Sequence, residues 1–258
     1  MRNILAVAGV VIKELYRRKD FYVLFIVTIL ICLIMASINI YDDTHVVRYL
    51  KEISLLLIWL CSLVIAVTTT ARQIPAEREN RTLLPLLAKP LSRGQLILGK
   101  FLGCWLACGL ALFCFYLFFG ALAASREHQW PLLNYVQVGV MHWFLLGIIV
   151  ALTLLGSLVF AAPSSNATIC FVIIGGILFV GRHLDQQALR LHEPVRTLVY
   201  ALYYALPHLE FYDLRDLVIH NWPLIEWPYI GLALLYAIFY MAFFLLGACL
   251  VFRRKAVN

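Results

Sequence analysis

The sequence has few charged residues, and its apolar runs contain almost none. Charged side chains make up 14% of the 258 residues, against about a quarter in ordinary soluble domains. Six apolar runs hold no Asp, Glu or Arg at depth, and their polar groups are Ser, Thr, Gln137, His142 and Asn166. Ion-coupled carriers and proton pumps need ionisable groups at mid-membrane, where the coupled ion binds. Their absence argues against both classes, and the absence of polar rings or a filter argues against a pore.

Two kinds of cofactor site are missing as well. The seven cysteines form no CxxC pair, and Cys104 and Cys108 have no nearby His or carboxylate, so no metal site is predicted. Residues 94–100 read GxxxxGK, but Phe101 stands where a nucleotide-binding loop needs Ser or Thr to hold Mg²⁺. We therefore expect no cofactor and no catalytic residue in this chain.

The apolar runs are long enough to cross a bilayer as helices. A hydrocarbon core of about 30 Å needs roughly 20 helical residues, and the mean hydropathy of the chain is +0.88. The predicted fold class is an all-α membrane protein with six transmembrane helices. The predicted spans are Phe21–Ile40, Ile53–Ala71, Gln95–Ala124, Asn134–Ala162, Ser165–Gly181 and Trp227–Phe252.

The distribution of basic residues predicts the orientation. The N-terminal segment, the 72–100 loop and the C-terminal tail carry 14 of the 21 Lys and Arg residues. Because Lys and Arg favour the cytoplasmic side, both termini are predicted to lie inside. The net charge of +7 follows from this asymmetry, so a nucleic-acid partner is not needed to explain it.

The N-terminal segment has the pattern of an amphipathic helix. An apolar stripe at helical spacing predicts that it lies along the inner membrane surface. The alternative is that it extends the first span as one long helix. The stripe comprises Ile4, Ala8, Val11, Ile12 and Leu15.

The loop from Arg72 to Lys100 is a polar stretch long enough to fold. Pro75 is expected to start a helix, and Ser92 is expected to cap a second helix that runs into the third span. We expect Lys100 to extend to the inner surface. After the loop, small residues at every fourth position predict close helix packing; they are Gly99, Gly103, Ala107 and Ala111. From its residues alone, this loop could be either a helix that binds a partner or a connector whose charges are only solvated.

Glu77–Leu83, Leu86–Arg93 and Leu98–Lys100 resemble the ABC-2 family of ABC-transporter permeases. That family typically carries an acidic residue, Gly-Thr-Leu, Leu-Leu, Pro-x-Ser-Arg and Gly-Lys between its second and third spans. Arg81 departs from the pattern, which often has Gly there. The likeness in topology extends over the whole chain, because the family also has six spans, an N-terminal elbow helix and both termini inside.

The resemblance implies one ABC-2 transmembrane domain over 1–258, with an elbow helix at 1–20, a coupling loop at 72–94 and an extracytoplasmic loop at 182–226. A coupling helix at about Pro75–Ala88 would dock onto a separate ATPase subunit, which would bind the ATP and Mg²⁺. The expected coupling residues are Glu77, Arg78, Glu79, Arg81, Thr82, Leu83, Leu86 and Leu87. The implied complex has two ATPase copies and either a homodimer or a pair of similar permeases in a bacterial inner membrane.

The extracytoplasmic loop contains two predicted helices, Pro194–Leu206 and Asp213–His220, that are too short to span. The family has re-entrant helices here that close the translocation path. An outer gate is therefore expected at Leu198, Leu202 and Leu206. A folded cap with no gating role fits the pattern equally well.

Taken together, these features predict the non-catalytic permease subunit of an ATP-driven exporter. One alternative is a mechanotransmitter that drives an extracytoplasmic partner and moves nothing through the membrane, as in the nitrous-oxide-reductase maturation systems, whose permeases share this family. The other is a membrane scaffold without transport.

Overall fold

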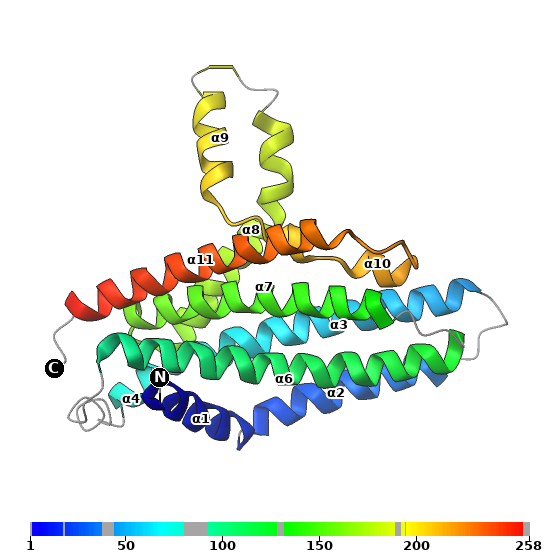
Figure 1. Ribbon diagram of the computed structural model, residues 1–258, viewed down its shortest axis with the longest axis horizontal. Coiled ribbons are helices and arrows are strands. Elements are labelled where there is room, and N and C mark those ends of the chain that lie inside the picture. The colour runs from blue at the N-terminus through cyan, green and yellow to red at the C-terminus, as the bar shows by residue number, and fades with distance from the viewer. Residues whose placement is uncertain are drawn as a thin grey trace.

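The computed structural model describes residues 2–17, 19–37, 44–79, 92–127, 132–188, 192–193 and 195–254. Regular structure in these ranges is entirely helical, as predicted. The long helices lie side by side in a bundle, and the end of α8 projects from it together with α9 (Figure 1). The elements are α1 (Arg2–Tyr16), α2 (Lys19–Ser37), α3 (Thr44–Ala71), α4 (Pro75–Glu79), α6 (Arg93–Glu127), α7 (Leu132–Val159), α8 (Pro163–Ala188), α9 (Val195–Ala205), η1 (Leu209–Tyr212), α10 (Arg215–Ile219) and α11 (Trp227–Arg254).

Within the described ranges, four helical stretches are long and apolar enough to cross a membrane: Val47–Glu79, Arg93–Ser125, Leu132–Val159 and Trp227–Arg254. A further apolar stretch, Pro163–Phe179, is shorter. The 35 residues of α6 measure about 52 Å at 1.5 Å per residue, well over the roughly 30 Å of a hydrocarbon core. This helix therefore extends beyond the lipid. The first predicted span falls on α2, except for residues 38–40, which lie outside the described ranges.

The N-terminal segment is a helix of its own. α1 ends at Tyr16, and the chain turns at Arg17, whose N–H donates to the Glu14 carbonyl at 3.2 Å, before α2 starts. One continuous helix is therefore wrong. Ala8, Val11 and Leu15 of the predicted stripe are buried, because this side of α1 packs against α6 and not against lipid.

α6 and α7 are joined at mid-helix by a reciprocal pair of tryptophans, here called the tryptophan clasp. The rings of Trp105 and Trp143 stack with centroids 4.6 Å apart. Each indole N–H donates to the backbone carbonyl of the other tryptophan, at 3.0 and 3.2 Å. Each ring also lies over a glycine of the facing helix, Gly147 under Trp105 and Gly109 under Trp143. The same W-x-x-x-G spacing on both helices thus satisfies two indole donors inside the apolar bundle.

Gly109→Ala is expected to destabilise the protein by about 1–3 kcal/mol, because its Cβ would collide with the Trp143 indole. The measurement is thermal unfolding of the detergent-purified protein. Gly120→Ala on the same helix is the matched control, since a Cβ there meets no atom within 4 Å. Equal unfolding temperatures for the two variants would show that the clasp does not constrain the helix pair.

Polar side chains inside the bundle are paired across helices. His142 of α7 contacts the Ser62 hydroxyl of α3 at 2.8 Å and the Tyr116 hydroxyl of α6 at 3.3 Å. Ser62 donates its own hydrogen to the Trp59 carbonyl, so His142 Nε2 donates to Ser62. Asn166 of α8 likewise donates to the Thr153 carbonyl of α7 at 3.1 Å. Such bonds hold helices together in lipid.

Candidate functional site

The segments that were predicted to face the cytoplasm gather at one end of the bundle, here called the inner end. The start of α1, α4, the start of α6 and the end of α11 all lie there (Figure 1). Of the eight expected coupling residues, Glu77, Arg78 and Glu79 belong to α4. The other five, Arg81, Thr82, Leu83, Leu86 and Leu87, lie outside the described residues.

α4 continues from α3 through one tight turn. Pro75 starts the helix, as predicted, because it has no N–H to lose and its fixed φ suits the first turn. Ile74 and Pro75 are buried, while the Ala76 and Arg78 N–H groups bond back to the Arg72 and Ile74 carbonyls at 3.0 and 3.2 Å. The helix is thus fixed to the bundle at its start, and Glu79 at its end is exposed.

A buried lysine ties this turn to α6. Lys100 is only 3% exposed, and its Nζ forms an ion pair with Glu77 Oε1 at 2.5 Å. The same Nζ donates to the Gln73 carbonyl at 3.2 Å and to Gln73 Oε1 at 3.1 Å. An ammonium group has three N–H donors, so all three have an acceptor. These three residues are called the inner lock below.

The expectation that Lys100 extends to the inner surface is wrong. A lysine reaches for water when no acceptor is nearer, but here Gln73 in the turn and Glu77 in α4 present three oxygen atoms to it. Satisfying the ammonium inside the protein replaces its hydration.

Two further contacts organise the inner end. Ser92 caps α6, as predicted, in a reciprocal capping box: Ser92 N–H donates to Gln95 Oε1 at 3.1 Å and Gln95 N–H to Ser92 Oγ at 3.2 Å. Arg93 donates from Nη1 to the Phe252 carbonyl at 2.8 Å and to the Arg253 carbonyl at 3.3 Å. The positive charge of Arg93 stabilises the C-terminus of α11, where the unpaired carbonyl groups carry partial negative charge. α6 is therefore joined to both α4 and α11.

The small-residue stripe lies against the N-terminal helices. A Cβ on Gly99 would lie 2.7 Å from Val7 Cβ, and a Cβ on Gly103 the same distance from Val11 Cβ. Both pairs are spaced by four residues, so the two helices run in register. Ala107 and Ala111 line a cavity of 260 Å³ that Ile12, Leu15 and Tyr22 close from the other side. The glycines let α1 approach the α6 backbone more closely than any side chain would allow.

At the opposite end, called the outer end, side chains of the bundle hold the backbone of residues 217–225. Lys51 of α3 is fully buried and donates to the Val218 carbonyl at 3.2 Å and to Asn221 Oδ1 at 3.1 Å. Asn134 of α7 donates to the Trp222 carbonyl at 2.9 Å, and Gln137 to the Ile225 carbonyl at 2.7 Å. The predicted helix at Asp213–His220 is confirmed as α10, and it forms part of the core.

An ion pair lies beside this segment. Arg215 makes two hydrogen bonds to Asp213, at 2.6 and 2.8 Å, and its guanidinium lies 5.4 Å from the centre of the Trp59 ring. Burial alone would lower the pKa of Arg215, but the hydrogen bonds and charge of Asp213 outweigh it and raise the pKa above its ordinary value. Arg215 is thus held in its charged form against α3.

Two of the three expected gate residues have described side chains, and their surroundings differ. The predicted helix at Pro194–Leu206 is confirmed as α9, but Leu198 is 68% exposed on the projecting arm. Leu206 packs against the core, and the side chain of Leu202 lies outside the described residues. The projecting arm therefore leaves its apolar side uncovered at Leu198.

The contacts described above connect the helices at both ends of the bundle. In the described ranges, no three His, Cys, Asp or Glu side chains converge as a metal site would require. The sequence-based prediction missed Gln73 and the cross-helix roles of Arg93 and Lys51. A signal existed for Gln73, since it stands four residues before Glu77 in the sequence, although the structure places it in the turn between α3 and α4.

Comparison with known proteins agrees with this arrangement. The family described as "ABC-2 family transporter protein" matches residues 6–255, and the match assigns no subfamily. No curated protein gives a significant match. The match covers the inner lock, the tryptophan clasp and the outer end alike. The chain, a multi-pass membrane protein, therefore belongs to the ABC-2 family of transporter proteins.

Proposed function

We propose that the chain is the non-catalytic permease subunit of an ATP-driven ABC-2 exporter. Residues 1–258 form one transmembrane domain, with α1 as the elbow helix and α2, α3, α6, α7, α8 and α11 as six spans. Both termini lie on the cytoplasmic side of a bacterial inner membrane. A separate ATPase subunit, present in two copies, binds the ATP and Mg²⁺.

The observation that supports this proposal most directly is the inner lock. A coupling segment must pass a displacement to a span without bending, and coupling between sites is typically worth about 1–3 kcal/mol. Glu77 lies in the segment proposed to contact the ATPase, and Lys100 lies on α6. The ion pair between them joins the two directly. When the ATPase moves α4, α6 and the α1 packed on it move as one body.

The permease acts as a pair of copies whose relative motion opens a path outward. In each copy α9 forms the outer gate, and Leu198, Leu202 and Leu206 meet their counterparts across the pair. The exposure of Leu198 in the single chain supports this assignment, since an uncovered apolar side chain on a projecting helix is available for contact with a second copy.

A second candidate is a mechanotransmitter that drives an extracytoplasmic protein and moves no substrate. The projecting arm of α8 and α9 favours it, because the exposed apolar side chains of α9 would also serve as a binding surface for such a partner (Figure 1). The two candidates differ in whether ATP hydrolysis depends on a transported substrate or on the extracytoplasmic partner.

The proposed coupling segment is tested by charge reversal. The double variant Glu79→Arg with Arg81→Glu is expected to lose co-purification with the ATPase subunit by about tenfold, while its unfolding temperature in detergent stays unchanged, since Glu79 is exposed. The measurement is the amount of ATPase retained on the tagged permease.

The matched control reverses an exposed pair at the outer end, Arg48→Glu with Glu52→Arg. This variant is expected to retain the ATPase in full. Normal retention by the Glu79 and Arg81 variant would count against the coupling segment. Equal loss in both variants would show that the effect is not specific to the inner end.

A further inference from the structure

α3 extends from the outer end of the bundle to the inner end, where the chain turns into α4 (Figure 1). Its 28 residues include neither glycine nor proline, whereas α6, α7 and α11 each contain two or more glycines. Sharp kinks in helices usually arise at these two residue types. α3 is therefore a stiff element about 42 Å long at 1.5 Å per residue.

The inner end of α3 is fixed to the inner lock by Gln73. Its Nε2 donates to the Thr69 carbonyl, in the last turn of α3, at 3.4 Å, and its Oε1 accepts from Lys100 at 3.1 Å. The Gln73 N–H also donates to the Thr70 carbonyl at 3.1 Å. One residue thus joins the end of α3 to the ion pair between α4 and α6, so a displacement of α4 acts directly on α3.

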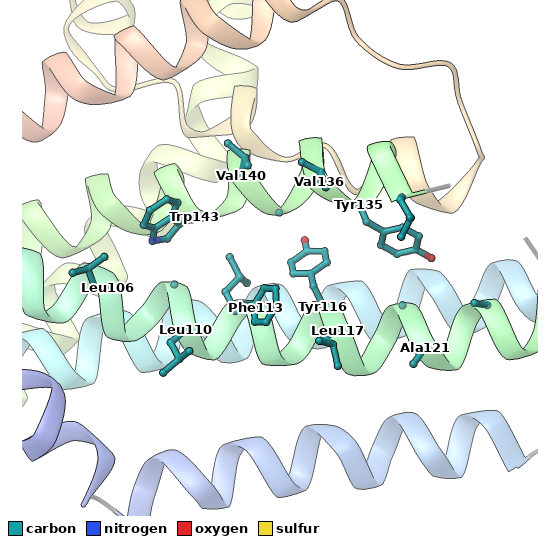
Figure 2. A pocket seen from close by; sticks show the side chains of 16 residues that line it. Leu106, Leu110, Phe113, Tyr116, Leu117, Ala121, Tyr135, Val136, Val140 and Trp143 are labelled. Atoms are coloured by element: carbon teal, nitrogen blue, oxygen red, sulfur yellow. The ribbon is translucent and has the colours of Figure 1, made fainter. Parts of the chain in front are cut away.

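Polar contacts also hold α3 at mid-length. Ser62 contacts His142 of α7 at 2.8 Å, and the same imidazole contacts the Tyr116 hydroxyl at 3.3 Å. Figure 2 shows Tyr116 pointing from α6 toward α7. The three helices are tied together between the two ends of the bundle, and these ties limit bending of α3.

At the outer end a buried lysine joins α3 to residues 213–221, here called the outer segment. Lys51 is fully buried and donates to the Val218 carbonyl at 3.2 Å and to Asn221 Oδ1 at 3.1 Å. Burying an ammonium group is costly unless oxygen atoms replace its hydration. Sliding α3 past the outer segment would remove these acceptors from a buried charge, and this cost favours movement of the two as one body.

A second contact joins the same two elements. The Arg215 guanidinium, at the start of α10, lies 5.4 Å from the centre of the Trp59 ring of α3. Trp59 and Lys51 are about 12 Å apart along α3 at 1.5 Å per residue, so α10 is attached to α3 at its start and near its end. The outer segment follows α9 and η1 in the chain, and a displacement of the segment therefore acts on α9.

We propose that α3 transmits the displacement of α4 to the outer segment, and that Lys51 is the positioning residue that makes the outer segment follow. This inference rests on the proposed function, because it needs an ATPase that moves α4. It adds a route through α3 to the connection with α6. The inner lock receives the movement, α3 transmits it over about 30 Å from Ala71 to Lys51, and the outer segment passes it to η1 and α9.

The test is hydrogen–deuterium exchange of the permease–ATPase complex, compared without nucleotide and with ATP trapped by vanadate. In the wild-type complex the exchange rate is expected to change about fivefold in both residues 73–79 and residues 213–221, the lower end of the usual range for coupled sites. Lys51→Met removes the charge and keeps the length, and it is expected to retain the response at 73–79 and lose it at 213–221. Arg48→Met is the matched control, because Arg48 is exposed on the same helix, and it is expected to behave as wild type.

Asn221→Gly keeps the test decisive if Lys51→Met fails to fold. Asn221 has a φ of 52°, in the left-handed region that glycine adopts freely, and the Trp222 N–H closes the turn onto the Leu217 carbonyl at 3.1 Å. The variant therefore keeps the backbone and removes one acceptor of Lys51. It is expected to lose part of the response at 213–221 and none at 73–79. Because the readout is a difference between two nucleotide states, a segment that is only looser raises both rates alike and does not imitate this result.

The results distinguish failure of the inference from failure of the proposed function. No response at 73–79 in the wild-type complex would overturn the proposed function and this inference with it. A wild-type response at 73–79 without one at 213–221 would overturn the inference alone. A full response at 213–221 in Asn221→Gly, and in Lys51→Met where it folds, would show that the movement reaches the outer segment by another helix, and the inference would again be wrong.

Discussion

Lys100→Met is expected to destabilise the protein by about 3–5 kcal/mol, the usual cost of removing one partner of a buried ion pair. Methionine has similar length and no charge, so the change removes the ammonium group and little volume. Two Gln73 oxygens and Glu77 Oε1 then lose their shared donor. The measurement is thermal or denaturant-induced unfolding of the permease in detergent.

The double variant Lys100→Met with Glu77→Met separates the contribution of the ion pair to stability from the contribution of side-chain packing. When both charged partners are replaced by apolar groups, the desolvation cost disappears along with the attraction, and much of the stability is expected to return. Lys13→Met provides the control for losing a positive charge at the inner end, because Lys13 is exposed, and it is expected to stay within about 0.5 kcal/mol of wild type.

The same double variant tests whether the inner lock transmits motion. If the lock is the connection between α4 and α6, the stable double variant still binds the ATPase but no longer links ATP hydrolysis to movement of the permease. A double variant with full stability and full ATP-driven activity would show that the ion pair serves folding alone.

Helix ends were predictable where local residues decide them. Pro75 and Ser92 mark the starts of α4 and α6 because a missing N–H and a capping hydroxyl act within one turn. The apolar runs located the long helices for a similar reason. Hydropathy marks the part of a helix that suits lipid, however, and not the end of its hydrogen bonding. α3 therefore begins at Thr44, nine residues before Ile53, and α8 continues to Ala188, beyond Gly181.

Cross-helix partners were not predictable in the same way. The burial of Lys100 depends on Gln73, which lies 27 residues earlier in the chain, and no local pattern states that the two meet. The apolar stripe of α1 was correctly identified but assigned to lipid, because a helical period shows that a face is buried and not what buries it. Gly99 and Gly103 mark the surface of α6 on which that face of α1 packs.

The tryptophan clasp was only partly predictable from the sequence. Trp105 with Gly109 and Trp143 with Gly147 repeat one spacing on two neighbouring helices, so the pattern is visible in the sequence. Its meaning depends on the antiparallel pairing of α6 and α7, which places each ring over the glycine of the other helix. A repeated large-and-small spacing on adjacent spans is therefore a usable signal once the two spans are known to pack.

Gly99→Ala with Gly103→Ala is expected to separate α1 from α6, with a loss of about 1–3 kcal/mol for each overpacked site. The atoms in the way are rigid ones. Besides the Val7 and Val11 Cβ atoms, the Ile4 and Ala8 carbonyl oxygens lie 3.0 Å from the added methyl groups. No side-chain rotation relieves these contacts, so the helices must move apart. Thermal unfolding in detergent and protease cleavage within 1–20 measure the separation.

Gly94→Ala is the matched control on the same helix, because its Cβ would meet only Cys249 Sγ at 4.0 Å. Replacing a helical glycine by alanine at an open position stabilises by up to about 1 kcal/mol, so the control and the double variant are expected to shift in opposite directions. The two glycines are neighbours, so their effects need not add. If the double variant matches Gly94→Ala in stability and protease resistance, α1 is not held on α6 at these glycines. Any coupling of α4 to α6 would then have to pass through Lys100 alone.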